Sequence, residues 1–117
     1  MPKKLDDLVM LLRVDGIYTP TNPLADTVHQ YKFHSDNNTF MVTILNTKEV
    51  FSGVYEYEYF DPQLTRINFT YGKAQTLTIY SISLVCETQR VGYFIFSQSQ
   101  GAIKPNVRQN TGVYVIE

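Results

Sequence analysis

The fold of this chain is decided by one stretch of ten residues, Phe51-Ser52-Gly53-Val54-Tyr55-Glu56-Tyr57-Glu58-Tyr59-Phe60. Within it, three tyrosines alternate with two glutamates. Because successive side chains of an extended strand point to opposite faces, the tyrosines share one face and the glutamates the other. At helical spacing the three rings would scatter around the axis. The stretch therefore predicts a β-strand that buries its tyrosines and exposes its glutamates.

Similar alternation recurs along the chain, notably in residues 27–34, 39–47, 64–71 and 91–98. Turns rich in Gly, Pro, Asn and Asp separate these segments. Within residues 76–86 the alternation changes phase, which predicts a β-bulge near Tyr80-Ser81. We expect an all-β fold of about eight antiparallel strands in an up-and-down barrel, with a two-sheet β-sandwich as the alternative. The lack of helical segments between the strands excludes a parallel α/β fold.

The N-terminal region shows a different periodicity. Four apolar residues lie at positions i, i+3, i+4 and i+7, namely Leu5, Leu8, Val9 and Leu12. This spacing predicts a short helix over residues 4–13 that packs its leucine face onto the β core. The remaining residues, 16–117, would form the barrel, and residues 1–117 a single domain.

The composition excludes several classes of protein. A net charge of -1 lacks the basic excess of a general nucleic-acid binder. The single cysteine, Cys86, allows no intrachain disulfide, as is usual in a reducing cytoplasm. The apolar run near the N-terminus is too short for a signal peptide or a membrane span. We therefore expect a cytoplasmic protein that binds neither nucleic acid nor membrane.

A resemblance to a known group follows from the order of the strands. The run Gly53-Val54-Tyr55-Glu56-Tyr57, the strand at 64–71, the Gly72 turn, and the runs 77–80 and 92–94 resemble the calycin-like barrels, which include the lipocalins, and in particular small bacterial lipocalin-like domains. The resemblance covers most of residues 14–99, with Gly16-Ile17-Tyr18 in place of the lipocalin Gly-x-Trp signature. It implies a barrel that carries a small apolar or aromatic ligand.

The tyrosine strand offers two candidate sites, depending on which of its faces meets the core. If Tyr55, Tyr57 and Tyr59 face outward, they form a stripe suited to protein recognition, because tyrosine is enriched at interfaces. In that orientation Glu56 and Glu58 face inward, where paired carboxylates can act as acid and base.

The segment 98–110 is a third candidate, because long loops in compact domains are often functional. Lys104 and Arg108 give it positive charge, which suits an acidic or phosphate-bearing partner. His29 and His34 lie on opposite faces of one strand and cannot share a metal ion there. The sequence implies no metal site, no cofactor and no catalytic triad.

Three functional hypotheses follow. The first is a non-enzymatic protein that binds another protein, for example an immunity protein that neutralises a bacterial toxin. The second is a lipocalin-like carrier, with a ligand-sized cavity lined by residues such as Phe33, Phe69 and Phe94. The third is an enzyme in which Glu56 or Glu58 faces inward with a raised pKa, beside Arg66 or a histidine.

Overall fold

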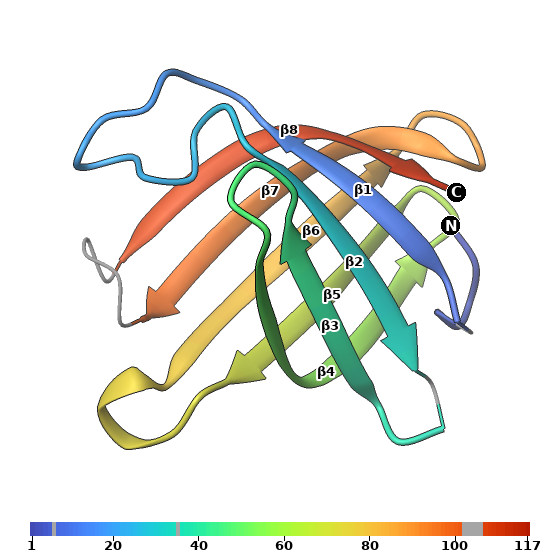
Figure 1. The fold of residues 1–117 in the computed structure, drawn as a ribbon. Coiled ribbons are helices and arrows are strands. Elements are labelled where there is room, and N and C mark those ends of the chain that lie inside the picture. The colour runs from blue at the N-terminus through green and yellow to red at the C-terminus, as the bar shows by residue number, and fades with distance from the viewer. Residues whose placement is uncertain (6, 35, 102–106) are drawn as a thin grey trace.

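The computed structural model describes residues 1–5, 7–34, 36–101 and 107–117. Eight antiparallel strands pair in chain order (Figure 1). Their bounds, with one 3-10 turn η1, are β1 Val9–Val14, β2 Val28–His34, β3 Thr39–Ile44, β4 Glu49–Asp61, β5 Leu64–Tyr71, η1 Ala74–Thr76, β6 Thr78–Cys86, β7 Val91–Gln100 and β8 Arg108–Ile116. Strand β1 also pairs with β8, so the sheet closes on itself. The predicted up-and-down barrel is confirmed, and the sandwich alternative is wrong.

The predicted helix over residues 4–13 is wrong. Residues 9–14 form strand β1, whose side chains at Met10, Leu12 and Val14 point into the barrel. An apolar run this short fits a helix and a strand equally well, and pairing with β2 and β8 supplies backbone partners that a lone helix lacks. The barrel therefore begins at Val9 rather than at residue 16. Within the described residues, no helix is long and apolar enough to cross a membrane.

Alternation of inward and outward residues builds the barrel wall. In β2 and β3 the predicted inward residues are buried, as the sequence indicated. The predicted phase change in β6 is wrong, because Thr78, Tyr80, Ile82 and Leu84 all face inward. A bulge does lie at this place. Ile79 pairs with Gln100 and Tyr80 with Gln98, so the additional residue lies in β7.

The two ends of the barrel differ. We call one end the mouth: there β1, β3, β5 and β7 end and the next strands begin. At the opposite end, the base, residues 1–5 lie across the opening and bury Leu5 in the core. The Tyr57 hydroxyl donates to the carbonyl oxygen of Pro2 at 2.6 Å, and the terminal ammonium of Met1 donates to that of Pro62 at 3.2 Å. A non-helical N-terminal segment, residues 1–5, therefore covers the base.

Aromatic rings fill the middle of the barrel. Phe69 is in contact with Phe40, Tyr31 and Tyr80, with ring centroids 4.8, 5.1 and 4.7 Å apart. The hydroxyl oxygens of Tyr31 and Tyr80 lie 2.7 Å apart, so each buried phenol has a hydrogen-bond partner. Beyond these rings, toward the mouth, the described residues leave open space inside the barrel.

Candidate functional site

A small pocket lies at the mouth of the barrel. Its volume is about 40 Å³, which is room for about three water molecules. Most of its wall is apolar or aromatic and includes Leu24, Phe51, Tyr71 and Phe96. No carboxylate is among the described residues that line it. The pocket is therefore a largely apolar recess with a few polar groups, the composition typical of small-ligand sites.

Arg108 supplies the positive charge of this pocket. It is the first residue of β8 and its side chain is half-buried against the ring of Phe96, 6.0 Å from the ring centroid. Its Nη2 donates to Oε1 of Gln98 at 3.4 Å. Its Nε and Nη1 atoms are buried and have no hydrogen-bond partner within the described part of the chain. Burial lowers the pKa of Arg108, but a guanidinium stays charged at neutral pH.

His29 is the second basic side chain among the described residues of the pocket lining, and it is neutral. Burial, and then the positive charge of Arg108, lower the pKa of His29 from 6.5 to about 4. The Thr27 hydroxyl donates to the carbonyl oxygen of Leu24. It therefore accepts a hydrogen bond from Nε2 of His29, 2.9 Å away. The proton of the neutral ring is thus on Nε2, and Arg108 is left as the one charge of the described pocket lining.

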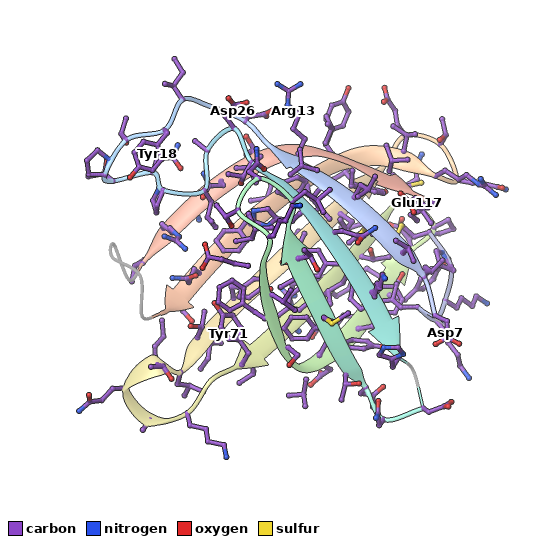
Figure 2. All side chains as sticks on the ribbon, in the orientation of Figure 1. Asp7, Arg13, Tyr18, Asp26, Tyr71 and Glu117 are labelled. Atoms are coloured by element: carbon purple, nitrogen blue, oxygen red, sulfur yellow. The ribbon has the colours of Figure 1, made fainter. Side chains whose placement is uncertain are left out.

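The elements around the mouth hold these groups in place. Leu24 belongs to the connection between β1 and β2, which is tied to the barrel by a hydrogen bond from Asn110 Nδ2 to Asn22 Oδ1 at 2.6 Å. Tyr71 ends β5 and is half-buried at the mouth, as Figure 2 shows. Its ring lies against Phe51 and Tyr80, with centroids 5.2 and 6.3 Å away. Most of the residues that line the pocket therefore belong to strands of the barrel.

The tyrosine strand has the predicted orientation. Tyr55 is 7% exposed and belongs to the core, and Tyr57 and Tyr59 are half-buried. The stripe is therefore not a free recognition surface. Tyr55, Glu56 and Tyr57 border an open groove of about 640 Å³ at the base. This groove is far from the mouth, since it shares its wall with Lys3 and Lys4 of the N-terminal segment.

The two glutamates do not form a catalytic pair inside the barrel. Glu56 is exposed, and Oε2 of Glu58 accepts hydrogen bonds from Nε and Nη2 of Arg66 on the outer face, both at 2.6 Å. This bond lowers the pKa of Glu58 rather than raising it. The prediction of an inward-facing glutamate with a raised pKa is therefore wrong.

The predicted contact loop at 98–110 is shorter than expected. Strand β7 extends to Gln100 and β8 begins at Arg108. Lys104 lies outside the described residues. Arg108, which was expected in an exposed loop, instead lies on a strand and lines the mouth pocket. Of the described residues of the predicted segment, Gln98 and Arg108 line the pocket.

His29 was not predicted as a site residue, and Gln98 was included only as the first residue of the segment 98–110. Their signal was present in the sequence, because each is a polar residue on the inward face of its strand, where the other inward residues are apolar, aromatic or Gly. His29 and His34 do lie on opposite faces, with Nδ1 of His34 3.8 Å from Oδ1 of Asp7 outside the barrel. In the described ranges, no three His, Cys, Asp or Glu side chains group as metal ligands would.

Comparison with protein-family models, with curated proteins and with solved structures finds no match to this chain.

Proposed function

We propose that this protein is a non-enzymatic binding protein that holds a small monocarboxylate in the mouth pocket of a calycin-like barrel. One observation carries the proposal: among the described residues, Nε and Nη1 of Arg108 are buried without an acceptor and no carboxylate lines the pocket. Buried donor atoms without an acceptor are unfavourable. A carboxylate supplies two acceptor oxygens in the geometry that a guanidinium fork matches.

The charge and size of the pocket narrow the ligand class. With His29 neutral, one positive charge suits a monoanion better than a phosphate that carries two charges. About 40 Å³ admits a carboxylate group with a short chain, but not a bulky ligand. An apolar or aromatic remainder of the ligand would lie against Leu24, Phe51 and Tyr71 at the rim. The ligand class is thus short aliphatic or aromatic monocarboxylic acids.

This proposal differs from the carrier predicted from the sequence. That carrier needed a ligand-sized cavity lined by Phe33, Phe69 and Phe94, yet these three side chains are at most 2% exposed and none lines the pocket. The interior is packed, so we propose recognition of a head group at the mouth instead of enclosure of a whole molecule.

Binding of butyrate and benzoate, measured by calorimetry and by NMR titration, tests this function. Butyramide and benzamide are the matched uncharged probes. We expect both acids to bind and both amides to bind much more weakly. Arg108→Gln should weaken binding of the acids about thirtyfold, because a charge-assisted hydrogen bond contributes about 2 kcal/mol. Arg90→Gln, which changes an exposed arginine outside the pocket, is the control.

Two results would contradict the proposal. One is that no acid binds to the folded protein, and the other is that Arg108→Gln binds the acids as well as the unchanged protein does. The protein partner predicted from the sequence, in its concrete form a toxin neutralised by an immunity protein, stays a prediction. The burial of Tyr55 removes the exposed tyrosine cluster that would have supported it.

A further inference from the structure

One sector of the outer barrel wall is apolar. Six large apolar side chains point outward from strands β6, β7 and β8 and are between 38% and 53% exposed. We call them the outer apolar face: Val85, Val91, Tyr93, Ile95, Val113 and Val115. None of the residues that point outward from β6, β7 and β8 is charged. A charged residue, Arg13 of β1, lies beside Val113 at the border of the face.

The strand register makes this face continuous. Tyr93 pairs with Val85 on one side and with Val113 on the other. Val91 pairs with Val115. Directly paired residues on one face of a sheet are about 5 Å apart. The six side chains therefore form one patch centred on Tyr93, with an exposed area on the order of 500 Å², near the upper end for the surface of a monomer.

Other sectors of the wall follow the usual pattern. The outward residues of β2 are Val28, Gln30, Lys32 and His34, and β4 and β5 are bridged outside by the ion pair of Glu58 and Arg66. On these strands the exposed Val54 lies between Thr39 and Thr70. The exposed Leu64 of β5 instead pairs with Val85 and continues the outer apolar face onto β5. Since the solvent face of an antiparallel sheet is normally polar, the outer apolar face needs an explanation of its own.

We propose that a second copy of this chain covers the outer apolar face. Because β1 pairs with β8, the barrel has no free strand edge, and another chain can only pack face to face. Tyrosine at the centre of a patch depleted of charge is typical of the core of a protein interface.

The charged residues around the face favour a second copy of this chain over a partner that carries a strong net charge of one sign. On β1, Arg13 pairs with Val113 and so lies directly beside the face. Its Nη2 atom is 3.5 Å from Oδ1 of Asp26 (Figure 2). Toward the base lie Arg90, which directly precedes β7, and Glu117, which directly follows β8. Both borders thus carry both signs, so a two-fold contact can place opposite charges together. With a net charge of -1, two copies repel each other little.

The area also suits self-association. Stable interfaces bury roughly 800 Å² per partner, of which the face supplies more than half and its polar border the rest. Because the face lies on the barrel wall and the pocket lies at the mouth, a dimer leaves both pockets open. The inference is therefore independent of the proposed ligand.

The test is sedimentation velocity, with light scattering after gel filtration, from micromolar to submillimolar protein. We expect the mass of the unchanged protein to rise from 13.5 kDa toward twice that value. Val113→Lys and Ile95→Lys, made separately, should each raise the dimer dissociation constant about a hundredfold or more, because each dimer then buries two charges. Val54→Lys is the matched control, since it makes the same change at an outward valine off the face.

A dimer lost in both face variants and kept in Val54→Lys supports the inference, provided that circular dichroism shows each variant folded. A protein that stays monomeric at every concentration overturns it, even if the face then binds a different protein. A dimer that survives in a folded Val113→Lys or Ile95→Lys variant also overturns it, because the contact must then lie elsewhere.

Discussion

His29 links the mouth pocket to the stability of the fold. Its ring is buried, its Nε2 proton is donated to Thr27, and Arg108 opposes a positive charge on it. The folded protein therefore holds this imidazole neutral, whereas the unfolded chain protonates it near pH 6.5.

The pH dependence of unfolding follows from this difference. Because the pKa is lowered from 6.5 to about 4 in the folded protein, the unfolded state binds more protons between these values. The contribution to stability is complete above pH 6.5 and is lost as the pH falls toward 4, by about 3 kcal/mol in total. Urea unfolding of His29→Gln between pH 7 and pH 4 should show a shallower decline. The exposed His34→Gln variant serves as the control, and an equal decline in both variants would contradict this assignment.

For single residues of the tyrosine strand, the sequence predicted which side chains point inward, but it did not predict which residues line the mouth pocket. Alternation placed Tyr55 and Glu56 on opposite faces, and the favoured orientation, with Tyr55 inside, is the one observed. The role of Arg108 depends on where β8 begins, and the polar residues of the segment before it gave no sign of that strand. Gln98 and Arg108 meet through the pairing of β7 with β8. That contact is a property of register, which local residue types do not specify.

Among the elements, the N-terminal segment differs most from expectation. Leu5, Leu8, Val9 and Leu12 fit helical spacing, but Met10, Leu12 and Val14 fit strand spacing in the same run. Local spacing does not show which strands can pair with this segment, because β8 lies at the other end of the sequence and β2 beyond a connection of 13 residues. Leu5 is buried in either case, but as part of a non-helical segment that covers the base.

Truncation of Leu5 tests the role of this segment. Leu5 is 2% exposed and is part of the core cluster, so Leu5→Ala should lower the free energy of unfolding by about 2–4 kcal/mol. Leu45→Ala makes the same change at a side chain that is 43% exposed and should have a much smaller effect. Urea unfolding at pH 7 measures both variants. If the two losses are equal, residues 1–5 do not close the base.

For the whole molecule, the decisive feature is the pairing of the first strand with the last. Five residue pairs join β1 to β8, from Met10 and Ile116 to Val14 and Gly112. An open sheet would expose both strands at its edges, where backbone amides open easily. Closure makes every strand a central one, so no part of the wall can open without breaking two ladders.

Native-state hydrogen exchange can detect this closure. We expect the opening free energies of paired amides in β1 and β8 to lie within about 1–2 kcal/mol of those in β5 and β6, since all eight strands belong to one cooperative unit. The connection around Ile17 and Tyr18, which are 83% and 65% exposed, should exchange with little protection and calibrates the fast limit. If β1 and β8 exchange as fast as this connection while β5 and β6 stay protected, the sheet is open in solution. The mouth pocket, whose wall includes the first residue of β8, would then lack its fixed cation.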